Sequence, residues 1–452
     1  MRRTLALLCT LPLPLGWGGC SSTLPPRGQA LIYLDTDAPL APSPGTDTAF
    51  DEPAPLFDGL RADVLDENGK VACDDCIRDF SIDRESLQAG RLSIGVVPRE
   101  GVPLRVRLRM FRRARMRGGE PPPASTVSAT FALPALGAEG VSEWTAFLPT
   151  ARLAIPDDGA AVPLVPGRPS PRAPIGTREA KDCNGAAARE GMVCAPGGTY
   201  WMDNALVAVD ALGRDLPERA VLLRAFYVDA HEVTVGQFRA AGVATASDPR
   251  RGQGTAADCT YTEASGGGEG LPVTCVSWDR AAAYCAARGD RLPTSAEIEY
   301  LAGGRRSRGY VWGEAAPACE DAVFARYRGP PSAPTESPAS GCASLGVGAA
   351  PPGSGRRDRL ALVGGDVVDI AGNVAEWTDD AAEPAAATTG RCKQPGFYEA
   401  PQCPARSARE DPLRVARGGS FALISTKSVS GFATNPATGD LRLGFRCAHD
   451  RR

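Results

Sequence analysis

The sequence predicts a mixed protein with two folded parts. An antiparallel β-sandwich comes first, and an α+β domain with little regular secondary structure follows. Three observations support this. The length of 452 residues exceeds the need of one small domain. Short apolar runs with period-two alternation and intervening turn residues fill the first third of the chain. With 51 Gly and 40 Pro, loops and turns outweigh long helices.

Composition narrows the class of partner. The chain is 43% hydrophobic, enough for a large core, and its formal net charge is only −3. Acidic and basic residues are interspersed, so neither nucleic acid nor a polybasic membrane patch is expected.

The N-terminus has the pattern of an export signal. Arg2 and Arg3 precede a short apolar run, and small residues lead to Cys20. A cysteine at this place resembles a bacterial lipobox. We expect residues 1–19 to be a signal peptide, Cys20 to be lipidated, and residues 20–28 to form a tether. Plain secretion and a short membrane anchor are the alternatives. The expected location is the cell envelope, anchored to a lipid membrane and facing the periplasm or the surface.

Cysteine usage agrees with export. Of 14 cysteines, Cys9 belongs to the signal peptide and Cys20 is the lipid site, which leaves an even number for an oxidised framework. Sequence alone does not set the pairing, but proximity suggests five pairs and leaves two distant cysteines. The suggested pairs are Cys73 with Cys76, Cys183 with Cys194, Cys259 with Cys275, Cys319 with Cys342, Cys392 with Cys403, and the remainder Cys285 with Cys447.

The β-sandwich is expected over residues 29–155, with strands near 30–34, 59–65, 91–97, 104–110, 126–133 and 144–153. Alternating arginines between Arg105 and Arg117 indicate a solvated strand face, with an acidic partner as the alternative.

The CxxC of Cys73 and Cys76 lies in a turn among strands, without the following helix of a redox motif or the second pair of a zinc site. A structural loop disulfide is therefore favoured.

Residues 156–182 are rich in Pro and Gly and are expected to be a linker. The second domain, residues 183–452, contains ordered motifs. Helix starts are predicted at Thr234, at Ser277 or Asp279, and at Thr294, where Glu297 completes a capping box. The motifs occupy residues 196–202, 224–238, 271–286, 291–304, 311–313, 369–378, 417–421 and 443–447.

These motifs, read in order, resemble the formylglycine-generating enzyme (sulfatase-modifying factor) family. The resemblance implies a C-type-lectin-like fold and a disulfide between Cys285 and Cys447. Family oxidases bind copper(I) through two cysteines just after the Gly-Gly-Ser motif. Here Leu423 and Ser428 occupy those positions, and no cysteine lies between Gly418 and Arg442. Copper(I) prefers thiolates, so we expect no copper and no catalytic residues of the known mechanism.

Other catalytic centres also lack ligands. Iron sites of relatives commonly take two His and a carboxylate, but the two histidines of this chain, His231 and His449, are expected not to be ligands. A serine triad is not expected either, because Gly419-Ser420-Phe421 is not a nucleophile elbow. The motif aromatics Trp278, Tyr300, Trp312 and Trp377 are expected in the core rather than in a ligand box.

A structural calcium site is the one metal site that the resemblance supports. The matching ligands are the side chains of Asp369 and Glu376 and the carbonyls of Gly372 and Val374. Alternatively, the two carboxylates only cap local backbone. The family's other calcium site is expected to be lost, because Val323 stands at its first position.

The predicted function is therefore a non-catalytic binding or envelope-assembly module in an exported lipoprotein. A peptide, protein or glycan is expected to bind at the loop from Ala422 to Arg442, an expectation that rests on fold analogy. The rival is an oxidoreductase of the same family that acts on a protein or small molecule through an unrecognised site.

Overall fold

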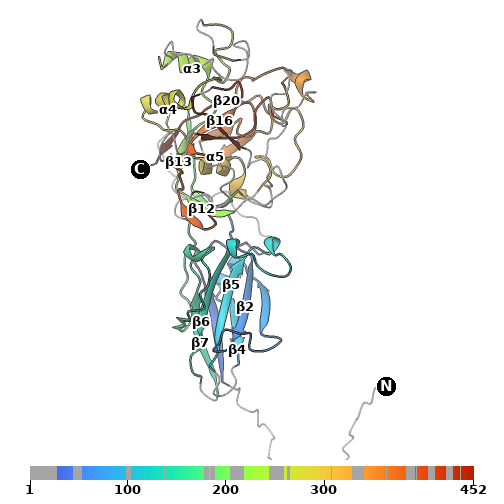
Figure 1. Ribbon diagram of the computed structural model, residues 1–452, viewed down its shortest axis with the longest axis vertical. Coiled ribbons are helices and arrows are strands. Elements are labelled where there is room, and N and C mark those ends of the chain that lie inside the picture. Colours follow the sequence, from blue (N-terminus) through green and yellow to red (C-terminus); the bar gives the residue numbers. More distant parts are fainter. Residues whose placement is uncertain are drawn as a thin grey trace, which may run out of the picture.

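The computed structural model contains a β-sandwich and a C-terminal domain joined end to end (Figure 1). It describes residues 28–43, 53–97, 103–136, 139–177, 183, 189–203, 218–243, 259–261, 265–306, 308–327, 341–362, 364–382, 392, 394–405, 413–423, 431–437 and 439–451. The predicted signal peptide and Cys20 lie outside these residues. In the described part of the chain, no helix has the length and apolarity needed to cross a membrane.

Two sheets face each other in the sandwich. The first has the order β4-β1-β7-β9 and the second the order β3-β2-β5-β6-β8. The first sheet consists of β1 (Gln29–Asp35), β4 (Ser93–Val96), β7 (Val141–Phe147) and β9 (Val165–Pro166). The second consists of β2 (Gly59–Leu65), β3 (Ile77–Ser81), β5 (Arg105–Phe111), β6 (Thr126–Ala132) and β8 (Val162–Pro163). A short helix, α1 (Arg84–Gln88), is capped by Asp83.

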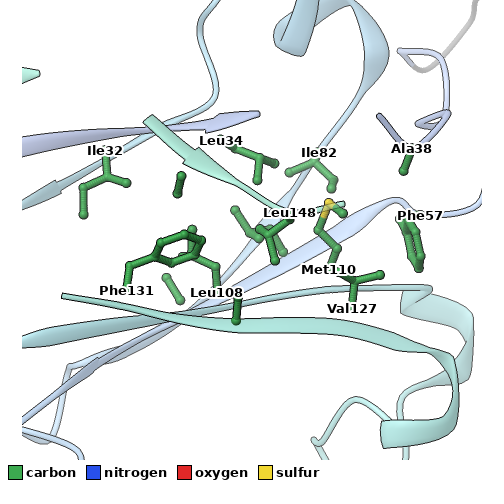
Figure 2. Packing of buried hydrophobic residues seen from close by; sticks show 14 of the residues in the cluster. Ile32, Leu34, Ala38, Phe57, Ile82, Leu108, Met110, Val127, Phe131 and Leu148 are labelled. Carbon is green, nitrogen blue, oxygen red and sulfur yellow. The ribbon is translucent and has the colours of Figure 1, made fainter. Parts of the chain in front are cut away.

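The predicted alternation places one face of each strand in a shared core. Figure 2 shows Ile32 and Leu34 from β1 facing Leu108, Met110, Val127 and Phe131 from β5 and β6. Most pairings are antiparallel, but β1 pairs with β7 in parallel over its whole length. Between β1 and β7 the chain crosses twice to the second sheet and returns, which provides the long connection that a parallel pair needs.

Two of the arginines on β5 have acidic partners within the chain, and the third, Arg105, donates to the Gly159 carbonyl at 3.2 Å. Arg107 and Arg109 reach the buried carboxylate of Asp63, with N–O distances of 2.7 and 2.9 Å. Arg109 also pairs with the exposed Glu120 at 3.1 Å. The outer face of this strand is thus a charged network rather than a free basic stripe.

The segment predicted as a linker adds structure to the sandwich. β8 pairs with β6 and β9 pairs with β7, so both lie at sheet edges. Each ends in proline, which lacks an N–H and is tolerated at an edge strand.

The C-terminal domain contains small sheets and short helices. Its sheets have the orders β10-β13-β21, β11-β12-β17, β14-β15 and β19-β18-β16-β20. The strands are β10 (Met192–Ala195), β11 (Gly198–Met202), β12 (Arg219–Leu223), β13 (Phe226–Asp229), β14 (Arg359–Leu362), β15 (Gly365–Val368), β16 (Ala375–Ala381), β17 (Phe397–Glu399), β18 (Arg414–Arg417), β19 (Gly431–Thr434), β20 (Leu443–Gly444) and β21 (Ala448–Asp450). The mixed character and the scarcity of helix agree with the predicted fold class.

The helices begin where their caps predict. They are α3 (Val235–Ala240), α4 (Trp278–Ala287) and α5 (Ser295–Leu301). Thr294 and Glu297 form the predicted capping box, and Thr234 forms another with Gln237. At α4 the capping residue is Ser277, although its side chain makes no capping hydrogen bond.

Six disulfides join the described cysteines in the pairs that proximity suggests. Five close short segments, whereas Cys285–Cys447 spans 162 residues and ties α4 to the end of the chain.

Candidate functional site

The Gly-Gly-Ser motif, residues 417–421, forms a tightly packed turn. Gly418 has φ +87°, and a Cβ there would lie 3.0 Å from the carbonyl oxygen of Ile370, so glycine is required. The N–H of Phe421 donates to the Asn373 carbonyl at 2.8 Å, and that of Ala325 donates to the Leu423 carbonyl at 2.9 Å. The turn is therefore fixed against the loop that carries the expected calcium ligands.

The predicted ligand loop, residues 422–442, is not entirely irregular. Residues 431–434 form β19, which pairs with β18 in antiparallel register. Leu423 occupies the first family thiolate position within this turn, whereas Ser428 lies outside the described residues. Since all twelve described cysteines are in disulfides, the described part of the domain has no free thiol.

Buried carboxylates gather beneath this turn, and one arginine pairs with part of them. Glu376 accepts from Arg446 through Nε and Nη2, at distances between 2.6 and 2.8 Å. Arg446 is fully buried and also donates to the carbonyls of Val368 and Asp369 at 2.9 and 3.1 Å. This ion pair is satisfied on both sides.

In the described part of the domain, no cation forms a salt bridge with the other acids of the group. Asp369 is fully buried, and its Oδ2 accepts from the N–H of Gly353 while Oδ1 has no hydrogen-bond partner. Both carboxyl oxygens of the buried Glu232 also lack a partner. Asp358 accepts from the N–H groups of Ile370 and Ala371 at 3.0 to 3.1 Å.

Burial governs the protonation of these groups. Desolvation raises the pKa of Asp369 to about 6, opposed by the Gly353 N–H and by Arg446. It raises the pKa of Asp358 to about 7, with a further contribution from the Asp369 charge. Desolvation and the Asp369 charge also place the pKa of Glu232 well above its usual range. The pKa of Glu376 is raised by burial as well, against the opposing charge of Arg446.

The expected calcium ligands lie on the turn between β15 and β16 and, in the case of Glu376, at the start of β16. Asp369 and Asn373 have positive φ values of 54° and 64°, so the backbone turns sharply between β15 and β16. A Cβ on Gly372 would approach the Val323 carbonyl oxygen at 2.8 Å, which explains the glycine. The unpartnered oxygen of Asp369 in a buried acidic environment fits a hard cation, and Glu376 retains acceptor capacity beside Arg446.

The two histidines contribute to different surroundings. Nδ1 of His231 lies 2.7 Å from the carbonyl oxygen of Glu232, at the margin of the acidic group. His449 lies on β21, where Nδ1 is 3.1 Å from Asp290. Among the described residues, no three His, Cys, Asp or Glu side chains converge to hold a metal ion.

A second buried charged group anchors the Gly-Gly-Ser turn from the other side. Arg417 donates to Ser295 Oγ at 2.6 Å and pairs with Glu299 at 3.1 Å. Asp203 stands where the family pattern has glycine, and its carboxylate pairs with Arg219 at 2.7 Å. Burial raises the pKa of Glu299 to about 7.

Of the four aromatic residues expected in the core, two are buried and two are only partly buried. Trp377 and Tyr300 are buried, and the indole N–H of Trp377 donates to the Val276 carbonyl at 2.8 Å. Trp278 and Trp312 are only partly buried, with Arg414 lying 4.1 Å from the ring centre of Trp278. Sequence reasoning missed Glu232 and Asp358, because only their burial distinguishes them from surface acids.

Known proteins resemble the C-terminal domain. A family model described as the sulfatase-modifying factor enzyme 1-like domain matches residues 179–451. The formylglycine-generating enzyme of Streptomyces coelicolor is 28% identical over 317 residues, covering 59% of this chain and 92% of that protein. The inactive C-alpha-formylglycine-generating enzyme 2 of Mus musculus is 30% identical over 186 residues, covering 39% of this chain and 49% of that protein. Thus the match spans about half of the mouse relative.

Among solved structures, PvdO from Pseudomonas aeruginosa shares 22% identity with a TM-score of 0.41, covering 57% of this chain and 94% of that one. The family match extends over more than half of the chain and includes the motifs that build the turn and the acidic loop. The chain therefore belongs to the sulfatase-modifying factor enzyme 1-like (formylglycine-generating enzyme) domain family.

Proposed function

We propose that this chain is an exported lipoprotein whose family domain is a non-catalytic binding or envelope-assembly module. One observation carries the proposal: the thiolate positions hold Leu423 and Ser428, and every described cysteine is in a disulfide. Copper(I) is soft and prefers thiolates, which a disulfide does not supply. The domain keeps the scaffold and lacks the residues for the known oxidation.

The ligand proposed for this module is a peptide, protein or glycan. It would bind at the surface formed by residues 422–442. The base of this surface is well fixed, since the turn at Phe421 and Leu423 is bonded to the neighbouring loops. Binding residues often lie on loops that a rigid scaffold positions.

We further propose that the domain holds one structural calcium ion. Asp369 and Glu376 would supply carboxylate oxygens, and Gly372 and Val374 would supply carbonyls. The ion would neutralise buried charge and hold the loop that supports residues 417–423. The unpartnered Oδ1 of Asp369 supports this proposal.

Attachment to a membrane is proposed through a lipid on Cys20. Intact-mass and peptide mass spectrometry of the protein from membranes should show an N-terminal acylated Cys20. A Cys20→Ser variant should move from the detergent-rich phase to the aqueous phase. An unmodified Cys20 would contradict the anchor without touching the proposal for the C-terminal domain.

The absence of catalysis is tested by turnover. The mature protein would be loaded with copper(I) under mildly reducing conditions and offered oxygen with a peptide containing Cys-x-Pro-x-Arg. The Streptomyces coelicolor enzyme serves as positive control. We expect no retained copper and no conversion of the peptide cysteine by mass spectrometry. Conversion by this chain would favour the oxidoreductase alternative.

A further inference from the structure

On one side of the sandwich, a groove lies between the edge strands of the two sheets. β3 is the edge of one sheet and β4 the edge of the other, and a groove of about 610 Å³ lies between them. Core-facing side chains of Val64, Phe80 and Ile94 form its apolar wall, and all three are only partly buried. The two sheets therefore leave part of the core uncovered where another strand would normally close it.

The backbone of β4 presents unused hydrogen-bonding groups at this groove. The Leu34 N–H donates to the Leu92 carbonyl at 2.9 Å, and Ile32 lies opposite Ile94. In this register Ile94 exchanges its hydrogen bonds with β1, so the N–H and C=O of Gly95 point away from the sheet. Among the described residues, no strand pairs with β4 on that side.

Exposed apolar side chains stand beside this free edge. Val71 and Val97 both line the groove and are 41% and 54% exposed. Natural sandwiches usually protect such edges with charges, prolines or covering loops, because a free edge recruits other strands. Within the part of the chain that the structure describes, no strand covers this edge, and together with the exposed valines it marks an interaction surface.

The charged residues at one end of the groove determine which way round a bound peptide strand would lie. Asp66 and Asp75 line the groove at the turn between β2 and β3, and Arg78 is the one cation among its lining residues. Asp74 is exposed next to Asp75. This end of the groove is thus acidic and favours a basic residue on the partner.

We propose that the groove binds an extended, basic polypeptide strand of a partner protein. The strand would pair with the free edge of β4 and place alternate apolar side chains over Val64, Phe80 and Ile94, which is recognition by strand addition. Its Lys or Arg residues would lie at Asp66 and Asp75.

The predicted tether that follows the signal peptide is not suited to bind in this groove. Residues 20–27 contain Pro25 and Pro26, which have no N–H to donate, and Leu24 is their one large apolar side chain. An alternating apolar strand from another protein matches the groove better. A second copy of this chain is an outcome that the test distinguishes.

The test uses the full mature chain with Cys20→Ser and a displayed library of random dodecapeptides. Selected peptides should alternate apolar and polar residues and carry Lys or Arg near one end. Their affinity, measured by fluorescence anisotropy, should fall at least about tenfold in Gly95→Pro. Proline is tolerated there because the Gly95 N–H faces outward and a Cβ would meet no atom within 4 Å.

Two further variants define the site. Asp75→Lys should weaken the basic peptides severalfold, with a smaller salt dependence than in the parent chain. Val165→Lys is the matched control, because Val165 is 59% exposed at the opposite edge of the same sheet. Its affinity should equal that of the parent, and circular dichroism should show all variants folded.

Several results would overturn the proposal. These are a library that yields no enriched peptides, or enriched peptides that bind Gly95→Pro unchanged. N-methylation of one of the two alternate sets of peptide amides should abolish binding, and equal binding after methylation of either set would exclude strand pairing. If sedimentation shows a dimer that Gly95→Pro dissociates, the groove belongs to a second copy. None of these results depends on copper, on calcium or on a lipid at Cys20.

Discussion

At the scale of single residues, the C-terminal domain contains more buried negative charge than its local cation offsets. Arg446 neutralises Glu376 at 2.6 Å, but none of the described residues forms a salt bridge with the fully buried Glu232, Asp358 and Asp369. A buried carboxylate without a cation partner is expensive, so such groups take up protons or bind a metal ion. The two predictions at this scale separate those outcomes.

The first prediction concerns calcium. At about 100 times the dissociation constant, calcium should raise the free energy of unfolding by about 2.7 kcal/mol. Asp369→Asn should remove most of this increment, because it removes a charged ligand. Asp366→Asn is the control, since that carboxylate pairs with Arg359 at the surface of the neighbouring hairpin. Urea unfolding with calcium or with EDTA measures the difference, and equal increments in both variants would refute the proposed ligand set.

The second prediction concerns pH. The pKa of Asp369 is raised to about 6 and those of Asp358 and Glu299 to about 7. The native state therefore holds protons that the unfolded chain releases, so stability is present at low pH and is lost as pH rises through these values.

In EDTA, the domain should be more stable near pH 5 than near pH 8, by an amount on the order of a few kcal/mol. Asp358→Asn should flatten this slope, because its amide oxygen still accepts from the N–H groups of Ile370 and Ala371. Urea midpoints across the pH range provide the measurement. A midpoint that rises steadily from pH 5 to pH 8 would be inconsistent with these raised pKa values.

At the scale of elements, sequence patterns predicted the features that depend on residues close together in the chain. The period-two runs gave the sandwich core, and the Thr294–Glu297 capping box set the start of α5. Contacts between residues that are far apart in the sequence could not be predicted in this way. β8, β9 and β19 are short and exist only because another strand accepts them. Likewise, nothing local to Glu232 shows that Asp369 and Arg446 lie near it.

The third prediction compares two disulfides. Cys285–Cys447 joins cysteines 162 residues apart and Cys73–Cys76 joins cysteines three residues apart. In the chain-entropy model, removing the long link with two Ala substitutions should destabilise the C-terminal domain by about 5 kcal/mol. Removing the short link in the same way should destabilise the sandwich by less than about 2 kcal/mol. Thermal unfolding of the two double variants measures this. Equal losses would mean that native-state packing, and not unfolded-chain entropy, sets the stabilisation.

At the scale of the whole molecule, the two domains share packing. Trp201 and Ala220 of the C-terminal domain belong to the hydrophobic cluster of the sandwich. The indole N–H of Trp201 donates to the Leu56 carbonyl at 3.1 Å, and its ring packs edge-on against Phe57. The sandwich and the family domain are therefore joined by buried contacts as well as by the connecting chain.

The last prediction concerns the ion pairs that close this junction. Arg112 and Arg115 of the sandwich reach Glu218 of the C-terminal domain at 2.8 and 3.0 Å, and burial lowers the pKa of Arg112. Glu218→Ala removes the carboxylate from two buried cations and should cost about 3–5 kcal/mol. It should also separate one unfolding transition into two, because the domains lose much of their coupling.

Differential scanning calorimetry of the mature chain measures both effects. Glu143→Ala is the control, because the Arg168 side chain of its ion pair is 64% exposed and ion pairs at the surface contribute little to stability. An intermediate result is informative as well: a single transition at lower temperature would mean that the apolar contacts of Trp201 maintain the coupling alone. A Glu218→Ala chain as stable as Glu143→Ala would show that the buried pair adds nothing, and that the junction is held by its apolar surface.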